Sequence, residues 1–166
     1  MYSFNKNLND EDATAVTDAY WEFILKIGGN GIAAITNQAN EMLLHDAAAS
    51  RLSKNMMQRV IRLHPPALTK GSWTKQLPLH YACRWNSRVA AESLASAFPA
   101  ALSIKDDDEK TPFEKIGDDW GETMTDDDKL LFKRATLRAI MEAHCRNNQA
   151  VLGYGTEKEV RIFITN

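Results

Sequence analysis

Side chains that act as bases, nucleophiles or metal ligands in enzymes gather in the middle of this chain of 166 residues. They are His45, Asp46, His64, His80 and Cys83. A hydrolase needs a nucleophile, a base that activates it and a third group that orients the base, and this spacing completes no such set. A zinc site needs ligands in closely spaced pairs, and the two cysteines of the chain are far apart. The sequence therefore predicts no catalytic residues and no metal site.

Other segments have compositions typical of ligand-binding loops. The glycine-rich residues 28–31 precede a predicted helix, where phosphate can bind, but they follow a helix and lack the dinucleotide spacing. Residues 70–72 lack the earlier glycine of a P-loop. The acidic runs 106–109 and 126–128 lack the alternating ligands of a calcium loop, which leaves weak cation binding as the alternative for them. We interpret all four segments as turns or helix starts and expect no cofactor.

The composition is that of an ordinary globular domain, with 44% hydrophobic and 25% charged residues. A formal net charge of −2 gives no reason to expect nucleic acid or a membrane as the partner. The first residues lack the basic and apolar regions of a signal peptide, and no apolar run is long enough to span a membrane. Both cysteines lie in apolar helical stretches, which favours buried, reduced thiols. We therefore expect a soluble protein of the cytoplasm or nucleus.

Three pairs of five-residue segments match at a separation of 34 or 35 residues, which is the mark of an internal repeat. The pairs are Leu44–Ala48 with Leu79–Cys83, His64–Leu68 with Phe98–Leu102, and Lys75–Leu79 with Glu109–Phe113. A small unit repeated in series stacks on its neighbours, because one unit cannot bury its apolar face alone. The chain is therefore expected to form a linear array.

Prolines mark the helices of each unit. Pro78 and Pro112 suit the first turn of a first helix, where a missing N–H costs nothing. Pro65 and Pro99 end the second helix, since the residue before proline avoids the α region. The polar residues between units have the composition of a projecting turn. Each unit is thus predicted to be a helix, a turn, a second helix and a loop.

Residues 77–83 and 106–113 resemble the ankyrin repeat, whose signature is Thr-Pro-Leu-His-x-Ala. The resemblance covers residues 41–116 and implies an all-α array of two to three helix-turn-helix repeats with helical N- and C-terminal caps. It also implies that His45 and His80 make structural hydrogen bonds between neighbouring loops.

The repeats depart from the family pattern at several positions. The signature threonine is replaced by Met42 in the first copy and by Leu77 in the second. It is present as Thr111 in the third copy, where Glu114 replaces the histidine. The glycine that usually precedes the threonine is absent from all three copies. The equivalent position is near Asn40 in the first copy, Lys75 in the second, and Glu109 or Lys110 in the third.

The whole chain, 1–166, is predicted to be one domain. Its parts are an N-terminal helical cap or degenerate repeat (12–40), repeat 1 (41–75), repeat 2 (76–109), a divergent repeat 3 with a capping helix (110–148) and a C-terminal tail (149–166).

Both caps carry an apolar stripe that is predicted to face the core. The N-terminal stripe is Val16, Tyr20, Phe23, Ile24 and Ile27, on a helix that ends at Gly28 and Gly29. The stripe of the capping helix, expected at about 127–147, is Leu130, Leu131, Arg134, Leu137, Ile140, Met141 and His144. Residues 160–165 in the tail are β-prone.

The resemblance implies a protein–protein interaction module or adaptor, without enzymatic activity, that binds another protein through its loop tips and first helices. The predicted contacts are Lys70, Trp73, Lys75, Trp85, Asp107 and Asp108. The alternative for the two tryptophans is that each ring packs against a neighbouring repeat. Residues 41–75 carry six basic against two acidic side chains, and 105–129 carry eleven acidic against four basic. Such blocks would create two poles that orient a partner. The alternatives are a small enzyme that uses His144 and Cys145 in the C-terminal cap, and a subunit or fragment of a longer repeat protein.

Overall fold

The computed structural model describes residues 10–118 and 125–152, and these residues form helices and loops without a β-sheet. The prediction of an all-α protein is confirmed at this level. The α-helices are α1 (Asp10–Gly28), α2 (Leu43–Ala49), α3 (Lys54–Leu63), α4 (Pro78–Arg84), α5 (Arg88–Ala97) and α6 (Asp126–Leu152). The short 3-10 helices are η1 (Asn30–Ala34), η2 (Pro65–Thr69), η3 (Pro99–Ser103) and η4 (Pro112–Lys115).

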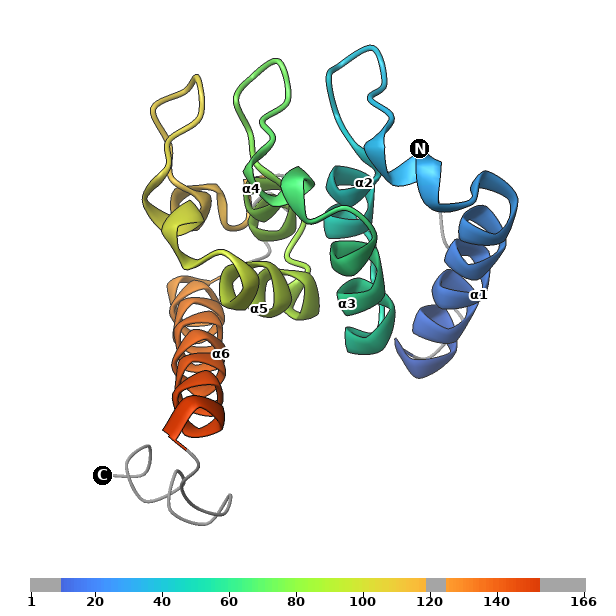
Figure 1. Cartoon of the computed structure of the whole chain (residues 1–166). Helices are drawn as coiled ribbons and strands as arrows, with labels where there is room; N and C mark the ends of the chain where they lie inside the picture. Colours follow the sequence, from blue (N-terminus) through green and yellow to red (C-terminus); the bar gives the residue numbers. More distant parts are fainter. Residues whose placement is uncertain (1–9, 119–124, 153–166) are drawn as a thin grey trace.

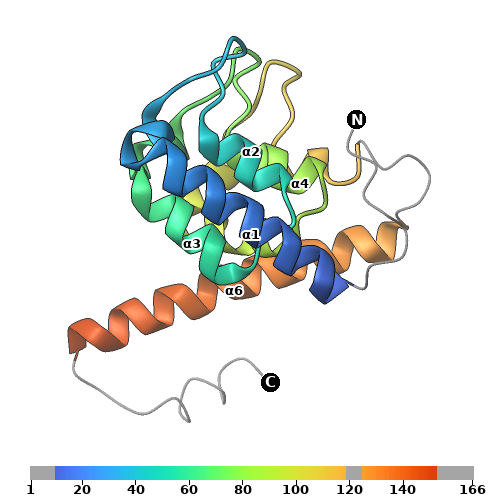
Figure 2. The same cartoon turned by 90° about the vertical axis from the view of Figure 1, so that its right-hand side faces the viewer.

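Three loops project from the same side of the helical body and stand next to one another (Figure 1). Helices α2 and α4 lie side by side below the loops, and α3 packs against α5 in a second row. Helix α6 packs along α5, while α1 lies at the other end of the array (Figures 1 and 2). The core is therefore a line of stacked helix pairs.

Each projecting loop is a hairpin closed by the same two backbone hydrogen bonds. In the first hairpin the N–H of Asn37 donates to the carbonyl of Glu41 over 2.9 Å, and the N–H of Asn40 donates to the carbonyl of Asn37 over 3.0 Å. The hairpins at 72–76 and 106–110 repeat both bonds. Their shared geometry places the fourth residue of each hairpin in the left-handed region. These residues are Asn40 (φ 58°), Lys75 (φ 56°) and Glu109 (φ 58°).

Proline ends two helices as predicted and then begins a 3-10 turn. Helix α3 ends at Leu63 before Pro65, and α5 ends at Ala97 before Pro99. The turns η2 and η3 follow at once, each with a proline in its first positions. The third turn, η1, comes after α1 and has no proline; there Gly29, at φ 59°, takes the chain out of the helix.

The core combines small residues in the first helices with larger ones in the second. Helix α2 buries Ala47 and Ala48 completely, and α4 buries Ala82. Alanine permits the close approach of α2 to α4, since side-chain volume limits the distance between helix axes. Helix α3 fills the remaining space with larger residues such as Met57 and Val60. Burial of these side chains stabilises the array by roughly 1.5–3 kcal/mol for each large aliphatic residue.

The apolar face that we predicted for α1 is not the face that packs on the array. Trp21 and Leu25 are buried, and α1 is tied to α3 because Asp18 Oδ1 accepts the N–H of Ser53 over 3.0 Å. Four residues of the predicted stripe lie on the outer side of the helix, and the fifth, Ile24, is half-buried. The exposed fractions of the four are 48% for Val16, 58% for Tyr20, 61% for Phe23 and 69% for Ile27.

Helix α6 shows the same reversal. Thr125 and Asp128 start it, with the N–H of each residue donating to the side chain of the other. Phe132 and Thr136 are its buried residues, and Ile140 packs partly against the core. The predicted face is mostly exposed, at Leu130, Leu131, Leu137 and Met141. The helix is longer than predicted, and the β-prone residues 160–165 lie outside the described part of the chain.

Candidate binding groove

A groove with a volume of about 610 Å³ runs between the hairpins and helix α4. It receives side chains from all three hairpins, from α4 and from the segment at and after η4. They are Ala39, Glu41, Ser72, Trp73, Thr74, Gln76, Tyr81, Arg84, Asp108, Lys110, Lys115 and Asp118. The lining is mostly polar and charged, with the rings of Trp73 and Tyr81 as its large apolar surfaces.

Backbone hydrogen bonds join the hairpins into one wall. The N–H of Trp73 donates to the carbonyl of Ala39 over 3.0 Å, and the N–H of Asp107 donates to the carbonyl of Thr74 over 3.1 Å. Because one such bond joins each pair of neighbouring hairpins, the spacing between the hairpins is fixed. A partner would meet a surface that is already organised, which lowers the entropy cost of binding.

Two histidines anchor the hairpins to the helices below them. His80 Nδ1 accepts the N–H of Leu77 over 3.0 Å, and His80 Nε2 lies 3.3 Å from the carbonyl of Lys110 in the third hairpin. An Nδ1 that accepts a hydrogen bond leaves the proton on Nε2, so the ring is neutral and Nε2 donates. His45 makes the same bonds to Met42 and Gln76. Burial lowers the pKa of both rings and keeps them neutral.

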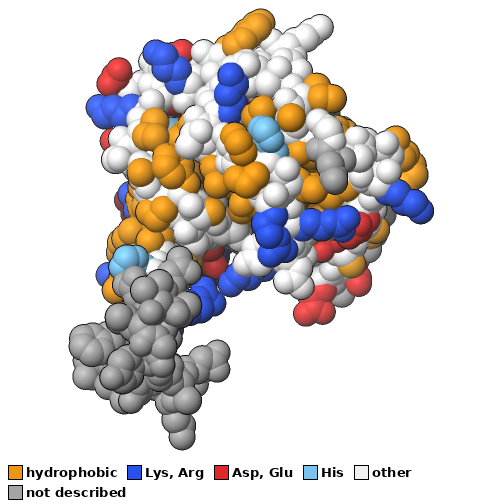
Figure 3. All heavy atoms as spheres, in the orientation of Figure 1, with side chains coloured by type: hydrophobic (Ala, Val, Ile, Leu, Met, Phe, Trp, Pro, Cys, Tyr) orange, Lys and Arg blue, Asp and Glu red, His pale blue; other side chains and the backbone are white. Residues whose placement is uncertain are grey.

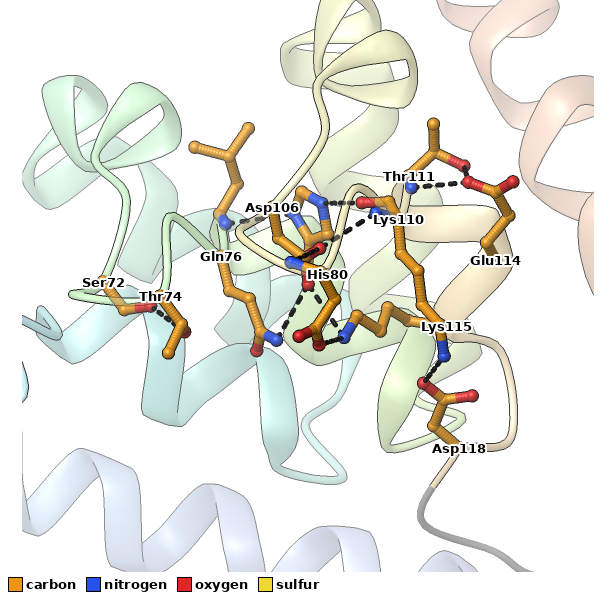
Figure 4. A network of polar contacts seen from close by, with 12 residues as sticks. Ser72, Thr74, Gln76, His80, Asp106, Lys110, Thr111, Glu114, Lys115 and Asp118 are labelled. Carbon is orange, nitrogen blue, oxygen red and sulfur yellow. Dashed lines mark hydrogen bonds and ion pairs between the residues drawn. The ribbon is translucent and has the colours of Figure 1, made fainter.

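A buried ion pair holds the third hairpin (Figure 4). Lys115 is 4% exposed and its Nζ lies 2.8 Å from Oδ2 of Asp106, which is 3% exposed. The same carboxylate accepts the side-chain N–H of Gln76 and the backbone N–H of Lys110, each over 3.0 Å. Burial alone would raise the pKa of Asp106, but these donors outweigh it and lower the pKa to about 2. Asp106 therefore stays ionised and joins the second hairpin to the third.

The third unit replaces the histidine with a carboxylate. Oε2 of Glu114 accepts hydrogen bonds from the backbone N–H and from the hydroxyl of Thr111, each over 2.7 Å. The backbone N–H at the start of η4 therefore has a partner. The pKa of Glu114 is lowered, first by the backbone bond and then by the hydroxyl bond. A carboxylate has no N–H with which to reach a further hairpin. Glu114 follows the last hairpin among the described residues, and it reaches no further one.

Tyr81 and Glu41 form the floor of the groove. The hydroxyl of Tyr81 donates to Oε1 of Glu41, and the two residues come from adjacent units. The ring of Tyr81 also packs edge-on against His45, with 5.2 Å between centroids. Burial, and then the bond to Glu41, raise the pKa of Tyr81 to about 12. The phenol therefore stays protonated and acts as a donor at neutral pH.

The structure places two of the six predicted contact residues in the groove, Trp73 and Asp108. Trp73 is 74% exposed, and Asp108 Oδ2 lies 2.6 Å from Nζ of Lys115. Lys75 and Asp107 pair with each other at 2.7 Å on the hairpin tips. Lys70 is exposed after η2, and Trp85 is 44% exposed at the end of α4; neither lines the groove.

Five carboxylates of the acidic block pair with lysines. Ion pairs join Asp106 and Asp108 to Lys115, and a further pair joins Lys110 to Asp118 at 3.0 Å. Lys75, in the basic block, reaches Asp107 in the acidic one. The two blocks therefore meet at the hairpins, and Figure 3 shows basic and acidic side chains next to one another on that side of the molecule. The groove presents charges of both signs.

Several residues of the groove were not predicted, including Lys115, Tyr81 and Gln76. Gln76 follows the left-handed tip residue of its hairpin, as Glu41 does in the preceding unit, so alignment of the repeats would have placed both. For Lys115 there was no such signal, because its role depends on Asp106, which lies nine positions earlier in another element.

The groups that could serve an enzyme are dispersed. His144 is exposed on α6 and Cys145 is half-buried, where we expected a buried thiol. Adjacent helix residues do not face each other, so these two side chains diverge. Cys83 is fully buried, and burial raises the pKa of its thiol.

Within residues 10–118 and 125–152, no three His, Cys, Asp or Glu side chains are arranged to hold a metal ion. None of the helices described there combines the length and hydrophobicity needed to cross a bilayer. In comparisons with known proteins, no protein-family model matches the sequence and no curated protein matches it.

Proposed function

We propose that this chain is a divergent ankyrin-repeat protein that binds another protein through the groove beside its hairpins. Three hairpins with the same closing bonds and the same left-handed residue, at spacings of 35 and 34 residues, support the repeat assignment. The two equivalent histidines, each bonded from a first helix to the next hairpin, support it further.

The observation that carries the binding proposal is the position of Trp73. Its indole is 74% exposed at the tip of the middle hairpin and lines the groove. Tryptophan is enriched among residues that dominate protein interfaces, because a rigid ring buries a large area at low entropic cost. Its backbone is held by the bond to Ala39, so the ring projects from a fixed position.

The groove suits a protein segment better than a small apolar ligand. Small-molecule sites are mostly apolar and enclosed, whereas this groove has charged residues of both signs, such as Glu41, Lys110 and Asp118. Alternating charges on a preformed surface favour a partner with a matching pattern of polar groups. The proposed partner is therefore a polar peptide segment that carries an apolar side chain to cover Trp73.

The two exposed tryptophans provide a matched test. We expect Trp73→Ala to abolish or weaken at least tenfold the retention of a partner captured from native cell extract, because it removes the apolar contact in the groove. Trp85→Ala makes the same chemical change outside the groove and should leave retention unchanged. Both variants should unfold within about 0.5 kcal/mol of the parent, since neither ring is buried.

Equal retention by the parent and by Trp73→Ala would reject the groove as the binding site. Loss of retention in Trp85→Ala alone would move the site to the end of α4. The double variant Lys70→Glu with Lys75→Glu is compared in the same capture experiment. Lys70 is exposed outside the groove, and Lys75 is paired with Asp107. Retention by this variant would remove both lysines from the set of contact residues.

A further inference from the structure

Helix α1 has two apolar faces, and only one of them is covered. Trp21 and Leu25 face the array. Val16, Tyr20, Phe23 and Ile27 form an outer stripe, here called the α1 stripe, whose side chains are 48–69% exposed. Figure 2 looks onto this end of the array and shows α1 in front of α2 and α3, with no described element over its outer side.

A helix that ends a repeat array normally carries a polar outer face, because an apolar one would be left in water. The α1 stripe departs from this rule. Its four apolar residues follow one another at helical spacing, and no charged residue lies among them. Helix α6 differs, because Arg134 interrupts its exposed residues Leu130, Leu137 and Met141. The α1 stripe is therefore the more continuous apolar surface.

The spacing of the α1 stripe is symmetrical. Its members are separated by four, three and four residues, so the order reads the same from either end. If two copies of α1 pair antiparallel, Val16 of each copy lies against Ile27 of the other, and Tyr20 lies against Phe23. Aliphatic side chains then meet aliphatic ones and aromatic rings meet aromatic rings. Such self-complementarity is what a twofold interface requires.

The area of the stripe is sufficient for such an interface. Complete burial of its two aromatic and two aliphatic side chains, at the exposures given above, would remove roughly 900 Å² in total across two copies. This area corresponds to a weak, reversible dimer rather than a permanent one. Edge-to-face contacts between the rings add a geometric preference.

We propose that this protein forms a homodimer through the α1 stripe, with the two α1 helices antiparallel. The groove lies on the hairpin side of the array, away from α1, so each copy keeps its groove open. The dimer thus presents two copies of the groove and would bind a partner with two recognition segments more tightly than one copy does.

The oligomeric state of the full chain tests the interface. We expect light scattering during gel filtration to give twice the mass of one chain as concentration rises through the micromolar range. Phe23→Glu should give the mass of one chain at the same concentrations, with an unchanged circular dichroism spectrum. Leu137→Glu makes the equivalent change on the exposed side of α6 and should leave the dimer intact.

Cysteine cross-linking tests the orientation. In a Cys145→Ser background, Val16→Cys and Ile27→Cys should each fail to cross-link alone under mild oxidation, because an antiparallel pair separates equivalent positions by about 16 Å along the axis. An equimolar mixture of the two variants should form a disulfide-linked dimer.

Three results would overturn the proposal. The first is a parent chain that has the mass of one copy at every concentration. The second is a dimer that survives Phe23→Glu. The third is cross-linking of either single-cysteine variant with itself, which would indicate a parallel pair. None of these readouts depends on a groove ligand, so failure of the dimer and failure of the proposed binding function are distinguishable.

Discussion

His45 and His80 hold successive units together through the same pair of hydrogen bonds. In each case Nδ1 accepts a backbone N–H at the start of its own helix over 3.0 Å. Nε2 donates to a backbone carbonyl of the following hairpin, over 3.2 Å to Gln76 and 3.3 Å to Lys110. Both nitrogens are used, so protonation of either ring breaks a bond at Nδ1. The two histidines therefore make the array sensitive to pH.

We predict that the free energy of unfolding falls as the pH is lowered below about 6.5. Burial holds the pKa of His45 and His80 below the ordinary value. In this range the unfolded chain consequently binds more protons than the folded one, so stability declines as pH falls. Urea unfolding at pH 7.5, 6.0 and 5.0 measures the decline.

His80→Ala provides the control for this prediction. The variant should be about 3 kcal/mol less stable at pH 7.5, since Leu77 N–H and the Lys110 carbonyl each lose a buried partner. Its stability should then fall less steeply with pH, because one of the two rings that take up a proton is gone. An equally steep decline in the parent and the variant would show that these histidines do not cause the pH dependence.

The buried ion pair between Lys115 and Asp106 gives a second prediction. We expect Lys115→Met to destabilise the protein by about 3 kcal/mol, because it leaves the Asp106 carboxylate buried without its cation. The variant should also raise the pKa of Asp106 from about 2, the value that Lys115 and the other donors maintain. Chemical denaturation measures the first effect and carbon NMR of the carboxyl group the second.

The double variant Lys115→Met with Asp106→Asn should lose less stability than the sum of the single losses. Additive losses would mean that the pair is not coupled. In the parent, a carboxyl pKa of about 2 adds stability above pH 4, which is lost as pH falls toward 2. The associated free energy is about 2 kcal/mol.

The left-handed tip residues allow a stabilising substitution. Glu109 has φ 58° and a side chain that is 83% exposed. Glycine adopts this conformation without the strain that a Cβ causes, so Glu109→Gly should raise the free energy of unfolding by about 1 kcal/mol. The ion pair with Lys105, at 3.5 Å and exposed, contributes little that would be lost. Thermal and urea unfolding measure the gain.

Two variants serve as comparisons for that substitution. Glu109→Ala removes the same ion pair but keeps the Cβ, and it should give no gain. Asn40→Gly should gain less than Glu109→Gly, because Asn40 Nδ2 donates to the carbonyl of Gly71 over 2.9 Å and this bond would be lost. If Glu109→Ala stabilised the protein as much as Glu109→Gly, backbone strain would not be the cause.

The ends of helices α3 and α5 were readable from the sequence because local residues determine them. Pro65 and Pro99 end α3 and α5 through the restriction that proline places on the residue before it. The period of 34 or 35 residues also placed His45 and His80 at equivalent positions, and the structure gives them equivalent bonds. These features depend on neighbouring residues in the sequence and not on the residues that pack across the core.

Only the tertiary structure decided which apolar face of the terminal helices is buried. Helix α1 has one face with Trp21 and Leu25 and another with Tyr20 and Phe23, and both have helical spacing. The larger stripe was predicted to be the core face, but the shape of the neighbouring helices selected the other one. Periodicity counts apolar residues along one helix, whereas burial depends on a surface built by residues far away in the sequence.

The groove likewise combines features set by the local sequence with features set by the tertiary structure. The local pattern predicts the projecting loop that carries Trp73, but only the structure shows that its ring is exposed. The pairing of Lys115 with Asp106, and of Lys75 with Asp107, arises when separate hairpins stack. Coulombic attraction acts through space rather than along the chain, so only the folded array decides which charges meet and which remain available to a partner.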